Sequence, residues 1–149
     1  MGNLTLKTSI TINAPAQKVW QALTDPAIVK QYFFGTNVQS DWKKGSPITW
    51  TGEWQGKQYQ DKGAILDITP GQYVKYSYWS SMGGTEDKPE NYQNVSYDLK
   101  ENNGVTTFEL TQDNIKSEEA KQHSEQNWQA VFGKMKEMIE TGNILNFIG

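Results

Sequence analysis

The side chains that could perform acid–base catalysis are few, and most of them are predicted to face solvent. Such catalysis needs a carboxylate, imidazole or amine held inside a pocket with a shifted pKa. Strand alternation places three carboxylates opposite their inward aromatic neighbours: Glu53, Asp98 and Glu109. Asp61 and Asp67 share a face opposite the apolar residues of their strand and are also predicted to point outward. Asp61 would enter a pocket only if a bulge reversed its strand.

Nucleophilic and metal chemistry are also poorly represented in the sequence. The chain contains no cysteine, which removes disulfides, thiolate catalysis, thiolate zinc sites and iron–sulfur clusters. The one histidine, His123, falls near the start of a predicted helix and is expected to be solvated. The acidic pairs at 86–87 and 118–119 are interpreted as solvated charges, and the lysine pair at 43–44 as part of a turn. We therefore predict neither a metal site nor a cofactor and assign no catalytic residue.

The charged residues argue against a nucleic-acid partner. All 14 basic residues are lysines, and the formal net charge is −3. Arginine is the residue that makes bidentate contacts with guanine and phosphate, and an acidic chain is repelled by a polyanion. No apolar run approaches the ~18 residues of a membrane span, and no segment resembles a signal peptide. We expect no nucleic-acid binding, no membrane insertion and a cytoplasmic location.

Aromatic residues, which make up 12% of the chain, carry the strongest functional signal. Many fall on faces predicted to point inward, where apolar side chains with a few hydroxyl groups can form a small-molecule pocket. Inward aromatics more often form plain core, so the pocket hypothesis depends on how little material fills the interior. The candidate ligand-binding residues are Trp50, Trp54, Tyr76, Tyr78, Tyr97, Phe108, Trp128, Phe132 and Met135.

Hydrophobic spacing predicts the elements that carry these residues. Alternating apolar residues predict strands at 4–12, 47–54, 59–68, 73–80, 93–101 and 105–112. Pro15 and Pro26 suit the first turns of two short helices after the first strand. The Asn-Gly pair at 103–104 predicts a hairpin between the last two strands. A long helix with one apolar stripe follows, with Ser117 as its N-cap and Gly142 as its C-cap.

The order of these elements predicts an α+β fold with an internal space. An antiparallel sheet of this length has one apolar face, and only one long helix is available to cover it. The sheet must therefore curl around that helix, and the two short helices can close one open end. A curved sheet covered by a single helix tends to leave a space between the two layers.

Short stretches along nearly the whole chain match one superfamily in order and spacing. They are residues 10–15, 18–20, 22–26 and 32–33, the strand through Gly63 with its turn at 69–71, residues 76–79, and Trp128, Phe132 and residues 135–136. Together they show that the chain resembles the START-like, SRPBCC (Bet v allergen-like) superfamily. Within it, the chain is most similar to the group named after the activator of heat-shock protein 90 ATPase, in its carboxy-terminal domain.

The resemblance implies a helix-grip fold. In that fold a curved antiparallel sheet of about six to seven strands wraps a long C-terminal helix, and two short helices follow the first strand. We expect one such domain over residues 1–149. In this superfamily the cavity often holds a lipid, sterol, hormone or polyketide-like molecule. Members range from carriers to cyclases to co-chaperone modules, so the fold does not fix the function.

Three functions remain open at this stage. The favoured one is binding of a small hydrophobic or aromatic ligand without transforming it, with residues 82–92 and 32–34 as candidate gates. The second is a protein-interaction module, such as a chaperone regulator. Its surface would use Trp79, Tyr73 and Trp42, or the apolar tail at 145–148. The third, less favoured, is an enzyme of the cyclase or hydrolase kind.

Overall fold

The computed structural model describes residues 4–33, 35–80 and 86–142, with Trp54 described by its backbone alone. Seven strands of this described chain form one antiparallel sheet in the order β1-β7-β6-β5-β4-β3-β2. The strands are β1 (Leu4–Ile12), β2 (Asn37–Ser40), β3 (Pro47–Trp54), β4 (Lys57–Thr69), β5 (Tyr73–Ser80), β6 (Gln93–Asn102) and β7 (Val105–Ile115). The helices are α1 (Ala16–Thr24), α2 (Pro26–Tyr32) and α3 (Glu118–Thr141), with a short 3₁₀ turn, η1 (Pro89–Asn91).

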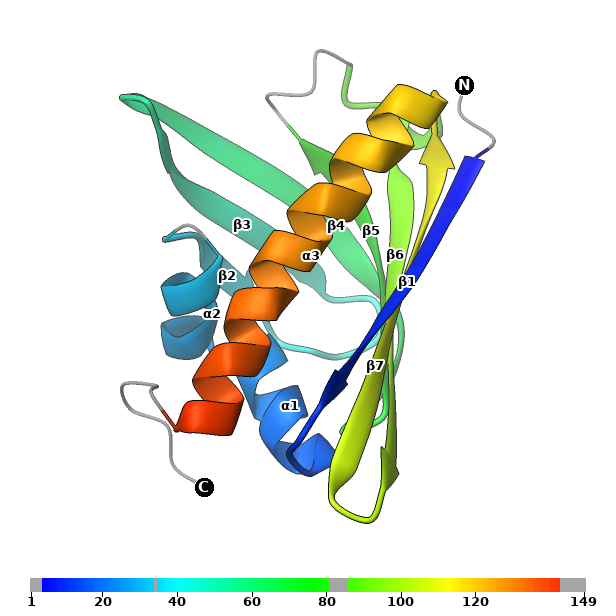
Figure 1. Ribbon diagram of the computed structural model, residues 1–149. Coiled ribbons are helices and arrows are strands. Elements are labelled where there is room, and N and C mark those ends of the chain that lie inside the picture. The colour runs from blue at the N-terminus through cyan, green and yellow to red at the C-terminus, as the bar shows by residue number, and fades with distance from the viewer. Residues whose placement is uncertain (1–3, 34, 81–85, 143–149) are drawn as a thin grey trace.

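The long helix α3 runs diagonally across one face of the curved sheet, and α1 and α2 lie near its C-terminal end (Figure 1). Strands β2 to β7 follow one another as a meander, and β1 pairs with β7 at the far edge. This is the helix-grip architecture, so the predicted fold class is confirmed. The four-residue strand β2 was not among the six strands located by alternation, because it is too short to show a period.

The N-cap of α3 and the hairpin turn form as predicted, and α2 has a capping side chain as well. The Asp25 side chain accepts a 2.9 Å hydrogen bond from the Ala27 backbone N–H at the start of α2. Ser117 accepts a 3.1 Å bond from the Ala120 backbone N–H at the start of α3. Both bonds satisfy amides that have no partner within the helix. Between β6 and β7, Asn103 and Gly104 have φ values of 55° and 80°, the left-handed pair that a tight hairpin requires.

A bulge in β4 changes which side chains face the helix. The register with β5 shifts between Ile65 and Asp67, so Leu66 is an extra residue. Ile65 is buried and Asp61, four residues earlier, lies on the same inward face. After the bulge Ile68 packs on the core and Asp67 is exposed. The prediction that Asp61 and Asp67 share an outer face is therefore wrong, because the extra residue puts them on opposite faces.

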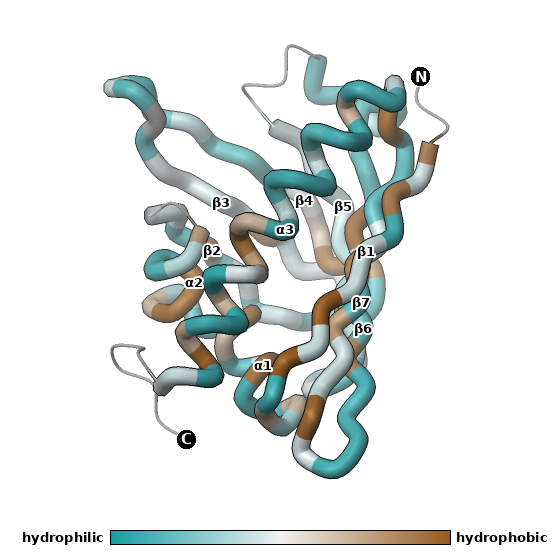
Figure 2. The backbone as a smooth tube through the Cα atoms, in the orientation of Figure 1, coloured by the Kyte–Doolittle hydropathy of each residue, from teal (hydrophilic) through white to brown (hydrophobic). Residues whose placement is uncertain are grey.

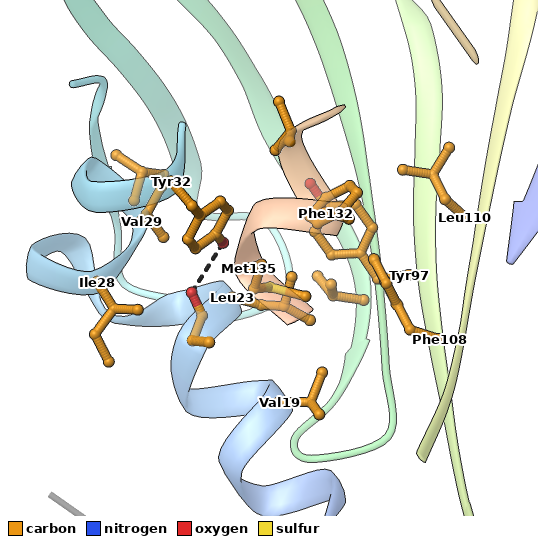
Figure 3. Packing of buried hydrophobic residues seen from close by; sticks show 14 of the residues in the cluster. Val19, Leu23, Ile28, Val29, Tyr32, Tyr97, Phe108, Leu110, Phe132 and Met135 are labelled. Carbon is orange, nitrogen blue, oxygen red and sulfur yellow. Dashed lines mark hydrogen bonds between the residues drawn. The ribbon is translucent and has the colours of Figure 1, made fainter. Parts of the chain in front are cut away.

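The hydrophobic core fills one end of the space between sheet and helix. The buried residues of α3 all belong to its second half: Val131, Phe132, Met135, Met138 and Ile139. Figure 3 shows Phe132 and Met135 packed among side chains of α1, α2 and the sheet. The Phe108 and Phe132 rings meet edge to face at 4.7 Å, and the Tyr32 hydroxyl donates a 2.9 Å bond to the Ala22 carbonyl.

The first half of α3 is polar and contributes no buried side chain to the core. None of its residues from 118 to 130 is buried, and its sequence is almost wholly polar until Trp128. Figure 2 shows this half as hydrophilic where it passes the strands β3, β4 and β5. Because it carries no apolar stripe, this half of the helix cannot fill the sheet's concave face. The interior is thus packed at the α1–α2 end and less densely filled at the other.

Candidate ligand-binding site

A cavity of about 520 Å³ lies between the first half of α3 and the strands that face it. Its aromatic lining residues are Phe33, Trp50, Tyr59, Tyr76, Tyr78 and Trp128. Its other lining residues are Thr36, Glu53, Asp61, Ser80, Gln93, Val95, Gln112, His123, Ser124 and Asn127. The volume is within the range of about 300–1,000 Å³ that is usual for small-molecule sites.

Three aromatic rings of the sheet pack against one another along one side of this cavity. Trp50 meets the Tyr76 ring at 5.1 Å and the Tyr78 ring at 5.2 Å, both in tilted or edge arrangements. Tyr76 shares a 2.7 Å hydrogen bond with the Tyr97 hydroxyl beneath it. Burial raises the pKa of both phenols well above the usual value, so both stay protonated at neutral pH. This side is therefore a rigid, uncharged, apolar surface with polar tips.

The carboxylate of Asp61 is the main charged group of the cavity. Its Oδ2 accepts a 2.6 Å hydrogen bond from the Tyr78 hydroxyl, while its Oδ1 is buried and has no hydrogen-bond partner. Burial, and then the Asp61 charge, raise the pKa of Tyr78, so the phenol remains the donor of this bond. A buried carboxylate oxygen without a donor is uncommon and costly.

A second hydroxyl pair lies on the β3–β4 side of the cavity. Tyr59 and Thr36 share a 2.5 Å hydrogen bond. Gly52 pairs with Tyr59 across the two strands, and a Cβ on Gly52 would lie only 2.5 Å from the Tyr59 hydroxyl oxygen. The missing side chain at position 52 is what allows the Tyr59 ring to fold across β3 and reach Thr36.

Trp128 separates this cavity from a smaller one of about 230 Å³ on the β1–β7 side of α3. Its indole Nε1 donates a 2.7 Å bond to Gln112, whose amide donates a 2.8 Å bond to Gln93. Its ring stacks on Phe132 at 5.3 Å with an angle of 7° between the planes, and the Phe33 edge meets it at 6.1 Å. These contacts fix the indole in one position, so both cavities have a defined boundary.

The predicted binding residues divide into two groups. Trp50, Tyr76, Tyr78 and Trp128 line the larger cavity. The remaining ones that can be placed lie deeper: Tyr97 and Met135 are buried in the core, and Phe108 and Phe132 border the smaller cavity. The side chain of Trp54 lies outside the described residues. Binding by these residues stays a prediction.

Several cavity residues were missed or placed elsewhere by sequence reasoning. Asp61 lines the cavity because of the bulge in β4. Strand alternation alone predicted an outward Asp61, and an inward one only if such a bulge were present. Glu53 and His123 are exposed, as predicted, but both line the cavity at its edge. The polar residues Gln93 and Gln112 gave no signal, because a glutamine on a strand has no pattern that marks it as inward.

The described residues hold no group of three or more His, Asp or Glu side chains arranged for a metal ion. In the same described residues, no helix is both long and apolar enough to span a membrane. Of the candidate gates, Phe33 lines the cavity and Tyr32 belongs to the core. Position 34, residues 82–85 and the apolar tail at 145–148 lie outside the described residues.

Comparison with protein families gives a match over residues 13–140 to the model described as activator of Hsp90 ATPase homolog 1-like protein. The chain belongs to this family. The predicted recognition is thereby confirmed, including the START/Bet v-like superfamily that shares the helix-grip fold. A search of curated proteins gives no match.

Solved structures agree with the fold described above. The chain is similar to protein ChR145 from Cytophaga hutchinsonii, with 44% identity, a TM-score of 0.83, and coverage of 95% of this chain and 97% of that one. It is also similar in fold to the Aha1 dimer from Colwellia psychrerythraea. That match has 19% identity and a TM-score of 0.73, and covers 93% of this chain and 98% of that one.

Proposed function

We propose that this member of the activator of Hsp90 ATPase homolog 1-like family binds a small organic molecule with a flat apolar body. The observation that carries the proposal is the cavity of about 520 Å³, lined by six aromatic rings and a few polar groups. Sites that bind small molecules have this combination of size, apolar lining and few convergent polar groups. The helix above it offers His123, Ser124 and Asn127, which can orient a ligand but cannot fill the space.

A panel of fatty acids, sterols and flat aromatic compounds tests the proposal by backbone and indole NMR. Binding in the cavity should shift the amides of β5 together with the indole signal of Trp128. The variant Ser124→Trp adds a large ring to the cavity from the helix side and should weaken binding by at least about tenfold. Gln126→Trp is the matched control, because Gln126 is exposed on the same helix and does not line the cavity.

Equal binding by the two tryptophan variants would place the ligand elsewhere and refute the proposal. Absence of any shift at β5 and Trp128 up to the solubility limits would refute it as well. The same samples test the enzyme alternative, in which Asp61 would act as a base, because turnover would produce new ligand signals over time. A ligand that stays unchanged supports binding alone.

The protein-interaction alternative has less support from the described surface. Trp79 on the outer face stacks on Tyr92 at 6.5 Å, and the Lys62 ammonium lies 5.8 Å from the Trp79 ring centre. Trp42 packs against the core. Leu66 is the exposed large hydrophobic residue of the described chain, at 39% exposure. These outer aromatics are already engaged by the chain itself, so a chaperone partner is not the leading proposal.

A further inference from the structure

The charge of the cavity lining restricts the chemistry of what it can hold. Of the described residues that line it, Asp61 and Glu53 carry carboxylates, His123 carries an imidazole at the edge, and none is a lysine. Lys62, the neighbour of Asp61 on β4, points to the opposite face, where its ammonium pairs with Asp87 at 2.5 Å. Strand alternation therefore removes the nearest cation from the cavity and leaves the negative charge inside it.

The hydrogen bonding of Asp61 is incomplete within the chain. The Tyr78 hydroxyl donates a 2.6 Å hydrogen bond to Oδ2. No donor in the described structure reaches Oδ1, which is buried. A carboxylate removed from water needs donors or a positive charge, since an uncompensated buried charge is strongly destabilising. Oδ1 itself is buried, so a bound molecule would compensate the Asp61 carboxylate by placing a positive charge beside it in the cavity.

The aromatic rings around Asp61 also favour a positively charged group in the cavity. Tyr78 donates to Asp61, and Trp50 packs on Tyr78 at 5.2 Å. Tyr59 and Trp128 also line the cavity. The faces of such rings carry partial negative charge and attract organic cations, and a carboxylate beside them adds to that attraction.

From these observations we infer that the ligand is an organic cation, a protonated amine on a flat apolar body, with the ammonium group at Asp61. The inference rests on the proposed function and narrows it. Fatty acids and other anionic amphiphiles are rejected, because their carboxylate would meet Asp61 in a cavity without a compensating lysine.

Three probes that share one ring system test the charge preference: naphthylmethylamine, naphthylmethanol and naphthoate. At neutral pH they are a cation, a neutral alcohol and an anion. The amine should bind at least about tenfold more tightly than the alcohol, and the carboxylate should bind most weakly. Equal affinities, or tighter binding of the carboxylate, would overturn the inference while leaving ligand binding itself intact. Failure of all three probes and of the wider panel would instead refute the proposed function.

A variant of Asp61 tests whether its carboxylate causes the preference for the amine. Asp61→Asn should lower the affinity for the amine about tenfold and leave the affinity for the alcohol within about twofold. Asp67→Asn is the matched control on the same strand, because Asp67 is exposed beyond the bulge and outside the cavity. An Asp61→Asn protein that keeps its preference for the amine would overturn the inference.

Tyr78→Phe provides a second test that keeps the carboxylate. It removes the donor to Oδ2 and leaves the Asp61 carboxylate in place, so this variant should bind the amine at least as tightly as the unmodified protein does. This variant keeps the inference testable if Asp61→Asn does not fold. A loss of amine binding in Tyr78→Phe, with the alcohol still bound, would contradict the assigned role of the carboxylate.

Discussion

The indole Nε1 of Trp128 donates a 2.7 Å hydrogen bond to Oε1 of Gln112 and so ties α3 to β7 between the two cavities. The bond lies just before the buried half of the helix begins. Toward the C-terminal end of α3 the interior is filled by the core, and toward its N-terminal end lies the larger cavity. The same contact therefore marks the end of the core and one boundary of the candidate site.

The hydrogen bond between Trp128 and Gln112 should contribute measurably to the free energy of unfolding. Trp128→Phe and Gln112→Leu each remove one partner and leave the other unsatisfied in a partly buried place. We expect each single variant to lower the free energy of unfolding by about 1–3 kcal/mol, and the double-mutant cycle to give a coupling of about 1 kcal/mol. Urea unfolding measures all four proteins. Additive effects would show that the hydrogen bond does not contribute to stability.

Gly63 should tolerate no side chain. A Cβ at this position would lie 1.6 Å from the backbone oxygen of Ser77, so the strands β4 and β5 would have to separate. We expect Gly63→Ala to cost more than about 3 kcal/mol in unfolding free energy. Gly133→Ala is the matched control, since a Cβ there meets nothing within 4 Å on α3. It should stabilise the helix by about 0.5–1 kcal/mol, and equal effects of both variants would contradict the close approach.

Alkaline pH should unfold the protein cooperatively. Burial raises the pKa of Tyr32, Tyr76 and Tyr97 in the folded state, so folding favours their protonated forms. The stability this gives is fully present below the unfolded pKa of about 10 and is lost as the pH rises above it. Each such tyrosine adds a slope of up to about 1.4 kcal/mol per pH unit.

Tyrosinate absorbance and circular dichroism, followed together, check this dependence. The buried tyrosines should ionise in the same transition in which secondary structure is lost. Tyr97→Phe should make the decline of stability with pH shallower, because one ionising group is removed. Ionisation of all tyrosines at about pH 10 in a protein that keeps its folded spectrum would contradict the burial described above.

The first half of α3 should depend on its N-cap more than on packing. None of its residues is buried, and Ser117 satisfies the Ala120 amide at its start. Ser117→Ala should cost about 1 kcal/mol and speed amide hydrogen exchange over residues 118–127. Exchange in the packed second half, from Val131 onward, should change little. A uniform change along the helix would show that the two halves unfold together.

The local elements were predictable from the sequence because each has a local cause. Alternation determined the long strands, Pro26 and the capping residue Ser117 determined where α2 and α3 begin, and the Asn103–Gly104 pair determined the last hairpin. The motifs spread along the chain determined the family and the helix-grip architecture, since their order and spacing depend on the sequence alone.

The composition of the candidate site was decided by the tertiary structure. The extra residue Leu66 in β4 turns Asp61 inward, and no local pattern predicts a bulge that depends on pairing with β5. The position of α3 decides that Trp128 borders a cavity, whereas Tyr97 is buried in the core. Periodicity shows which face a side chain occupies. Only the packing of distant segments decides whether that face meets another side chain or an open space.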